Sequence, residues 1–261
     1  MPHKIKTIYA LTIGLIIAIA QPNTIQAQVG AFITEWVSND DTLKIPITGT
    51  GYSISWTNVT NPGSMEGSQS GLTQPYTITN IEPYSTYRVS ITGNYSSFRM
   101  ITLGDPTSQT HHQRKLRGIV QWGTQVWENL QGAFYWCDSL SNYYATDTPN
   151  LTAVTDLSSM FLNCRSFNGD ISNWNTEHVT KMDSMFAGAT IFNQPIGNWN
   201  TANVTNMTYM FWYATNFNQA ISGWNTANVN NMKYMFAGAR IFNQPIGNWN
   251  TANVTDMSYM F

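Results

Sequence analysis

The residues of this chain whose types and spacing could do chemistry are aromatic side chains and two cysteines. The repeat carboxylates are scattered over unrelated positions, so they predict neither an acid–base pair nor a calcium ladder. They are Asp170, Glu177, Asp183 and Asp256. His111 and His112 are adjacent, but no third ligand follows at a spacing that suits zinc. No hydrolase, zinc-protease or phosphate-loop motif occurs. We therefore predict that the protein is not an enzyme and holds neither metal nor cofactor.

Aromatic side chains recur at one position of a sequence repeat. On a helical wheel Tyr209 lies roughly 140° from Val204, away from the apolar stripe, so we expect an outward row. Unit four also has a Trp-Tyr pair where its neighbours have Ala-Gly. Exposed aromatic residues of this kind favour macromolecular binding. The candidate binding residues are Tyr209, Trp212, Tyr213, Tyr234 and Tyr259.

Two alternatives to this aromatic row stay open. The row can be an ordinary solvated face or a contact with the next unit. The binding face can instead be the strand side of the repeats, which is the concave recognition face in other horseshoe solenoids. That side carries Ser172, Asn173, Gly197, Asn198, Ser222 and Gly223.

The two cysteines, Cys137 and Cys164, occupy the same position in successive units. In an exported chain such a pair suggests a possible disulfide. Packed helices lie about 8–10 Å apart, however, whereas a disulfide needs Cα atoms within roughly 7 Å. We expect buried thiols, with the disulfide as the alternative.

These residues are carried by a repeat with a constant step of 25 residues, which Trp174, Trp199, Trp224 and Trp249 mark most clearly. Such a period is typical of a solenoid. Apolar residues across Val204–Ala214 have the spacing of a short helix. The segment Ile196–Trp199 follows Pro195, which cannot continue a helix, and is predicted to be extended. We therefore predict an α/β solenoid of the leucine-rich-repeat kind, with one short strand and one short helix per repeat.

The predicted domain order places this solenoid last. Residues 1–27 form a signal peptide, with basic residues ahead of an apolar run. Residues 28–103 contain short β-type runs typical of a small immunoglobulin-like β-sandwich. The runs are Phe32–Val37, Leu43–Ile47, Tyr52–Trp56, Tyr76–Ile78, Tyr87–Ile91 and Phe98–Leu103. Residues 104–115 are a linker, and residues 116–261 are the solenoid, with a diverged first unit as a cap and a truncated last unit. We expect the chain to be a fragment or an incomplete reading frame.

Charge is sparse: Lys, Arg, Asp and Glu make up 10% of the chain, and the net charge is −2. The signal peptide contains only basic charges, so its removal makes the chain more acidic. This balance argues against nucleic acid and anionic membrane as partners. We expect a secreted or cell-surface protein with no membrane insertion after signal cleavage, and we predict no oligomeric state.

The pattern Met-Phe-x-x-Cys/Ala-x-x-Phe-Asn-x-x-Ile-x-x-Trp-Asn-Thr-x-x-Val-x-x-Met, read from Met160, resembles the repeat of BspA-like leucine-rich-repeat surface proteins of bacteria. The resemblance covers residues 116–261. It implies an exported module that binds macromolecules of a host or a neighbouring cell. We therefore expect non-catalytic binding of an extracellular protein or glycan, in adhesion. The alternatives are a structural stalk for a further domain and a carbohydrate-active enzyme.

Overall fold

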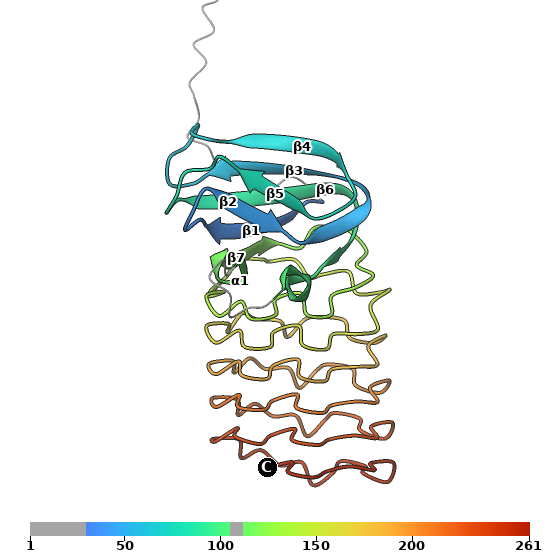
Figure 1. Cartoon of the computed structure of the whole chain (residues 1–261). Coiled ribbons are helices and arrows are strands. Elements are labelled where there is room, and N and C mark those ends of the chain that lie inside the picture. Colours follow the sequence, from blue (N-terminus) through green and yellow to red (C-terminus); the bar gives the residue numbers. More distant parts are fainter. Residues whose placement is uncertain (1–29, 105–111) are drawn as a thin grey trace, which may run out of the picture.

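The computed structural model describes residues 30–104 and 112–261 and has two parts, a β-sheet region followed by a stack of irregular layers (Figure 1). The predicted signal peptide and His111 lie outside the described residues. The predicted linker is described at Gly104 and from His112 onward, where α1 (His112–Lys115) forms a single helical turn.

The β-sheet region contains six strands and one 3-10 turn before α1. These elements are β1 (Phe32–Val37), β2 (Thr42–Ile45), β3 (Ile47–Asn58), β4 (Gly67–Leu72), β5 (Tyr76–Thr79), β6 (Thr86–Phe98) and η1 (Met100–Leu103). After α1 come β7 (Leu116–Gln121) and β8 (Asn142–Tyr143). The large sheet has the order β4-β3-β6-β1-β7-β8, and β2 pairs with β5 in a second, two-stranded sheet. Pairing is antiparallel throughout except between β7 and β8, which are parallel.

Alternating apolar residues explain why these segments are strands. In β6, Tyr87, Val89 and Ile91 are buried while the residues between them are partly exposed, which is the period of two that a half-buried strand requires. Five of the six predicted β-type runs lie within or overlap β1, β2, β3, β5 and β6, whereas Phe98–Leu103 contains only the last residue of β6 and then forms η1. The polar strand β4 was missed because Gly67–Leu72 has no such alternation.

The sheet and the layers share one core. Strand β7 pairs with β1, placing Ile119 opposite Thr34. The ring of Phe32 stacks on Trp122 at 5.5 Å and meets the edge of Trp127 at 5.0 Å. The first layer is thus built onto the sheet by apolar burial, which stabilises contacts in proportion to the area removed from water.

Each 25-residue repeat forms one layer, and equivalent side chains stack from layer to layer. The rings of Phe161, Phe186, Phe211 and Phe236 stack in sequence at 5.5 to 5.7 Å, with interplanar angles of 3 to 7°. Residues at the equivalent of Asp156 in successive layers form isolated parallel bridges. The four repeat tryptophans are buried. The 25-residue period therefore arises because equivalent apolar residues of successive layers form one continuous buried core.

The prediction of an α/β solenoid with one helix per repeat is wrong. Within Val204–Ala214, Asn206 forms isolated bridges and residues 208–213 form consecutive turns, with Tyr209 and Tyr213 in the left-handed region at φ 57° and 52°. The N–H groups of Tyr209 and Phe211 donate to carbonyls of the next layer, at 2.9 Å each. In an α-helix each N–H donates to the carbonyl four residues earlier in the same segment. A segment whose alternate N–H groups donate to the next layer therefore cannot be an α-helix.

The predicted repeat strand is wrong too. Within Ile196–Trp199 the chain turns, and the Trp199 N–H donates to the Ile196 carbonyl at 3.2 Å. Beyond β8 the repeat layers contain turns and isolated bridges but neither helix nor extended strand. The leucine-rich-repeat architecture implied by the BspA-like resemblance is therefore not that of this protein.

Candidate binding surface

The predicted tyrosine row exists, although turns and not a helix build it. Tyr209, Tyr234 and Tyr259 occupy the same left-handed turn position in three successive layers, with φ between 55 and 57°. Their rings are 4.8 Å apart in each pair, and the interplanar angles are 5° and 13°. Positive φ is typical of residues in tight turns. The row is a rigid stack of aromatic rings.

The pair Trp212-Tyr213 extends this row sideways. The Trp212 ring meets the Tyr209 ring edge-on at 6.0 Å and the Tyr213 ring at 4.7 Å. Trp212 is 38% exposed and Tyr213 is 48% exposed. The Tyr213 ring packs on Gly238 of the next layer, where an added Cβ would lie 3.0 Å from the ring. The five predicted residues therefore form one contiguous patch, which we call the aromatic surface.

A hollow opens beside Trp212 and Tyr213, with a volume of about 400 Å³. Its other lining residues are Asn163, Arg165, Gly188 and Thr190. Gly188 takes φ 71°, and a Cβ there would lie 2.2 Å from the Asn163 Oδ1 atom. The Asn163 side chain therefore fills the place where a Gly188 Cβ would lie, and Tyr213 is the larger residue at the equivalent position one layer later.

Sequence reasoning missed Asn163, Arg165, Gly188 and Thr190 as members of this surface. Only the 25-residue alignment of Gly188 with Tyr213 could have indicated the hollow, because it places a residue without a side chain next to a large one in the following layer. Two basic groups lie at this surface: Arg165 lines the hollow, and the Lys233 Nζ atom lies 5.6 Å from the centre of the Tyr234 ring. Cation–aromatic contacts at exposed sites contribute about 0.5–1 kcal/mol.

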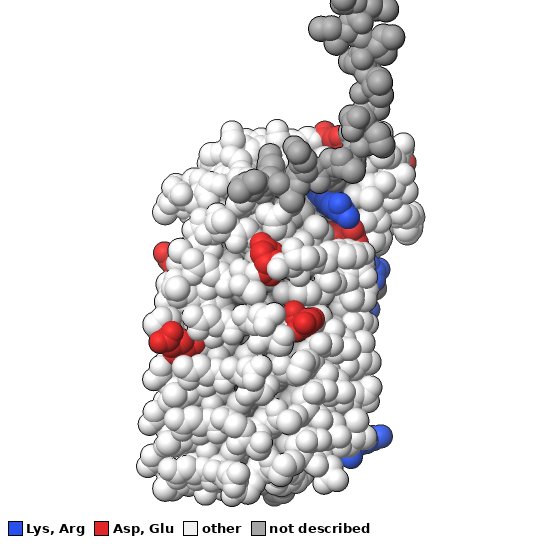
Figure 2. Space-filling model, turned by 180° about the vertical axis from the view of Figure 1, so that it is seen from behind, with Lys and Arg blue, Asp and Glu red and all other residues white. Residues whose placement is uncertain are grey.

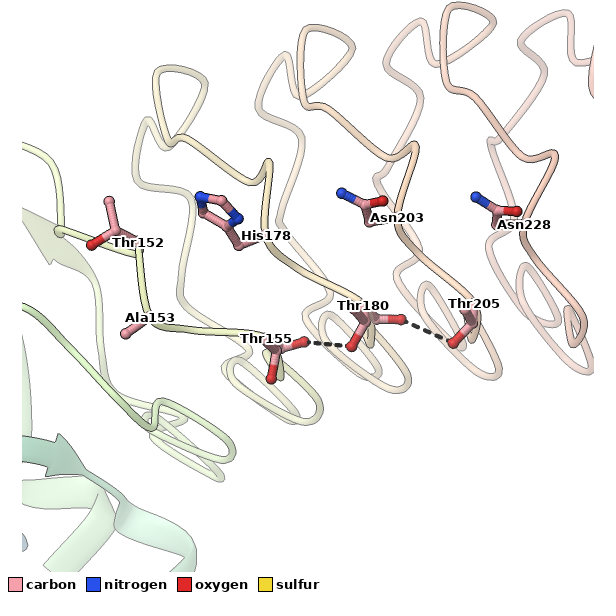
Figure 3. A pocket seen from close by; sticks show the side chains of 8 residues that line it. All are labelled: Thr152, Ala153, Thr155, His178, Thr180, Asn203, Thr205 and Asn228. Carbon is pink, nitrogen blue, oxygen red and sulfur yellow. Dashed lines mark hydrogen bonds between the residues drawn. The ribbon is translucent and has the colours of Figure 1, made fainter.

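A second, polar groove of about 370 Å³ crosses another face of the layers (Figure 3). The hydroxyls of Thr180 and Thr205 donate to the carbonyls of Thr155 and Thr180, one layer back, at 3.0 and 3.2 Å. The Asn203 amide donates to the Glu177 carbonyl at 2.7 Å. Because these donors are used to join layers, the groove offers less free hydrogen-bonding capacity than its residue types suggest.

The alternative strand-side face is not a sheet. Gly197 and Asn198 lie in a turn, and a Cβ on Gly197 would lie 2.4 Å from the Ala220 carbonyl oxygen. Ser172, Ser222 and Gly223 lie at turn positions as well. The concave sheet that would have displayed these residues is absent from the described layers. Asn173 instead lines a separate pocket with Trp174.

Cys137 and Cys164 are free thiols and both are fully buried. The Cys164 Sγ atom donates to the Phe134 carbonyl at 2.9 Å. Burial raises the pKa of both thiols well above the ordinary value, because a thiolate loses its hydration there. They are packing residues in this structure, without the properties of a nucleophile.

No group of three or more potential metal ligands forms among the described residues. Across the same ranges, none of the helices has the length and apolar character needed to cross a membrane.

A family model described as "Mycoplasma protein of unknown function, DUF285" matches residues 128–229 and 198–261. Together the two matches run from residue 128 to residue 261, just over half of the chain. This match replaces the BspA-like assignment, which no comparison supports. No curated protein and no solved structure matches the chain significantly.

Proposed function

The chain belongs to this DUF285 family, whose description names no function, and we propose that it is a non-catalytic binding protein that recognises an extracellular protein or glycan through its aromatic surface. The observation that carries the proposal is the contiguity of five partly exposed aromatic rings beside an open hollow. Rigid aromatic side chains supply contact area at a low cost in conformational entropy, which is why they dominate binding surfaces.

The layers do not require the rings of Trp212 and Tyr213. The layers on either side have Ala187-Gly188 and Ala237-Gly238 where this layer has Trp212-Tyr213, and they are stacked in the same way. Large exposed aromatic residues raise the risk of aggregation when they have no partner. Their presence where packing accepts Ala-Gly supports a role in binding.

The proposed location is extracellular or at the cell surface. Residues 1–27 have the composition of a secretory signal peptide. Viewed from behind, most of the surface of the layers is uncharged (Figure 2), which suits contact with proteins or neutral glycans better than with nucleic acid. The proposed role is adhesion.

The experiment compares binding of the chain to immobilised extracellular-matrix proteins and to a glycan array. The test variant is Tyr209→Ser/Trp212→Ala/Tyr213→Gly. It copies Ser184, Ala187 and Gly188 of the preceding layer, so folding should be retained. Loss of one buried aromatic anchor typically costs more than 1 kcal/mol in binding, so we expect the triple change to weaken binding at least about tenfold.

The matched control is Tyr84→Asn, which removes a tyrosine that is 82% exposed and lies at left-handed φ in the β-sheet region. Asparagine tolerates that backbone conformation. Binding by this control should equal that of the unmodified chain. Equal binding by the triple variant would exclude the aromatic surface. Absence of binding by every variant would favour a second role, a structural spacer, which the regular hydrogen bonding between layers also suits.

A further inference from the structure

The hollow beside Trp212 and Tyr213 has two walls of different chemistry. Asn163 and Arg165 come from the layer before Gly188, and Trp212 and Tyr213 come from the layer after it. Hydrogen-bonded layers lie about 4.8 Å apart, so these walls belong to layers about 10 Å apart. That separation leaves room for one ring between a polar wall and an aromatic wall. The volume of about 400 Å³ also falls within the range of small-molecule sites.

Arg165 supplies an unpaired positive charge at the polar wall. It is the one charged residue among the six described residues that line the hollow. Its side is exposed to solvent, and no ion pair between described residues includes it. A guanidinium is a planar fork of N–H donors that matches the two oxygens of a carboxylate. The hollow therefore offers a site for a ligand carboxylate.

The stacking of the layers does not require an arginine at this position. The next two layers have Thr190 and Thr215 there, and each threonine hydroxyl donates to the carbonyl of the equivalent residue one layer back, at 3.2 and 3.1 Å. Arginine returns at Arg240, three layers after Arg165 and outside the lining of the hollow. Because threonine joins the layers at this position, the charge of Arg165 is available to a ligand.

The hollow also offers hydrogen-bonding groups for hydroxyls. The Thr190 hydroxyl gives its proton to the Arg165 carbonyl at 3.2 Å, so its oxygen is left to accept from a ligand. The Asn163 side-chain amide has no hydrogen-bond partner among the described residues and can both donate and accept. On the opposite wall, the Trp212 ring is 38% exposed and presents an apolar face.

These groups together select the class of ligand. A neutral sugar would leave the Arg165 charge unpaired, and a small inorganic anion has no ring to place against Trp212. A peptide carboxylate would use Arg165 but not the polar groups of Asn163 and Thr190. A pyranose with a carboxylate uses all of them. We propose that the hollow binds an acidic sugar, with its carboxylate on Arg165, hydroxyls on Asn163 and Thr190, and its C–H face against Trp212.

This inference rests on the proposed function, because Trp212 and Tyr213 belong to both the hollow and the aromatic surface. It narrows the partner to a glycan that contains a carboxylate-bearing sugar, while the other sugars of that glycan can be neutral. Uronic acids and sialic acids share this chemistry, and the test distinguishes them.

The test titrates the full chain, by isothermal titration calorimetry, with two matched pairs of sugars. Methyl glucuronide is compared with methyl glucoside, and N-acetylneuraminic acid is compared with its methyl ester, so each pair differs in the charge of one group. At least one acid should bind about tenfold more tightly than its neutral counterpart, because it gains a charge-assisted hydrogen bond. Its affinity should fall as the salt concentration rises.

Two arginine variants form the matched comparison. Arg165→Gln changes an exposed side chain and keeps the carbonyl that accepts the Thr190 hydroxyl, so folding should be retained. It should weaken binding of the acid about tenfold and leave the affinity for the neutral sugar unchanged. Arg240→Gln removes an exposed arginine from the same repeat position away from the hollow, so it should leave both affinities unchanged. Trp212→Ala copies Ala187 of the preceding layer and should weaken both sugars of the pair.

The inference is overturned if neither acid binds more tightly than its neutral counterpart, or if Arg165→Gln and Arg240→Gln act equally. It is also overturned if acetate or a short peptide of Glu and Gly binds as tightly as the acidic sugars. Partner binding that the triple variant of the aromatic surface loses but Arg165→Gln retains would refute this inference and leave the proposed function standing. Partner binding that the triple variant retains would exclude both.

Discussion

Replacing Thr201 by valine tests whether buried hydrogen bonds between layers, and not apolar stacking alone, stabilise the repeats. Thr201 is 1% exposed, and its hydroxyl donates to the Asn225 carbonyl in the next layer at 3.0 Å. Thr176 and Thr226 make the same bond, also at 3.0 Å. Valine has nearly the same shape but no donor, so the carbonyl loses its partner in a water-poor site.

The expected cost follows from that geometry. A net hydrogen bond contributes about 1 kcal/mol, and a buried acceptor left unpaired costs about 1–3 kcal/mol. The extra buried methyl group offsets roughly 0.8 kcal/mol. We expect Thr201→Val to lower the free energy of unfolding by about 1–2 kcal/mol. For a chain of this size that corresponds to a fall in melting temperature of about 2–8 °C.

Thr180→Val is the matched control. The Thr180 hydroxyl makes the same type of bond between layers, to the Thr155 carbonyl at 3.0 Å, but in an exposed position. Water can replace the lost donor there, so the change in unfolding free energy should stay within about 0.5 kcal/mol. The assay is urea denaturation followed by tryptophan fluorescence. Equal destabilisation by both substitutions would refute the reasoning, because burial would then not matter.

Two further predictions concern ionisable groups. Lys115 is buried and its Nζ atom lies 2.7 Å from both Asp40 carboxylate oxygens. Burial alone would raise the pKa of Asp40, but hydrogen bonds from Lys115 and Thr42 together lower it below 3.8. The resulting stability is present above that value and is lost as pH falls through the lowered pKa. Asp40→Asn should lower the free energy of unfolding by about 1–3 kcal/mol at neutral pH. It should also make the melting temperature depend less on pH in the acid range, which a series of melting curves at different pH values measures. Cys137 and Cys164 should resist a thiol reagent at neutral pH in the folded chain and react in urea; rapid labelling without denaturant would contradict their burial.

The sequence predicted the features that depend on the alternation and period of apolar residues. Strand β1 lies where Phe32–Val37 was expected, and the 25-residue step places Trp199 and Trp224 in one buried series. Both results follow from burial, because a buried face requires apolar residues at a regular spacing in the sequence. Strand β4 has no such spacing, because its residues are polar and mostly exposed.

The error over Val204–Ala214 has a physical cause. Apolar residues spaced three and four apart are what a helix buries on one face, but consecutive turns bury the same residues. The difference lies in backbone hydrogen bonds: the Met210 N–H donates to the Met207 carbonyl at 3.2 Å, while the Tyr209 N–H leaves the layer. An N–H group that donates outside its own layer, as that of Tyr209 does, needs an equivalent segment in the next layer to accept the bond.

The same consideration explains which parts of the candidate sites could be found without coordinates. The tyrosine row follows from the period alone, because any constant step aligns Tyr209 with Tyr234. The hollow beside Trp212 and Tyr213 arises where one layer differs from the next, and its geometry depends on how the layers stack. In a repeat protein, regular positions explain stability and departures from the repeat mark candidate sites. The pair Trp212-Tyr213 is such a departure, and on this reasoning substitutions there should change binding more than they change folding.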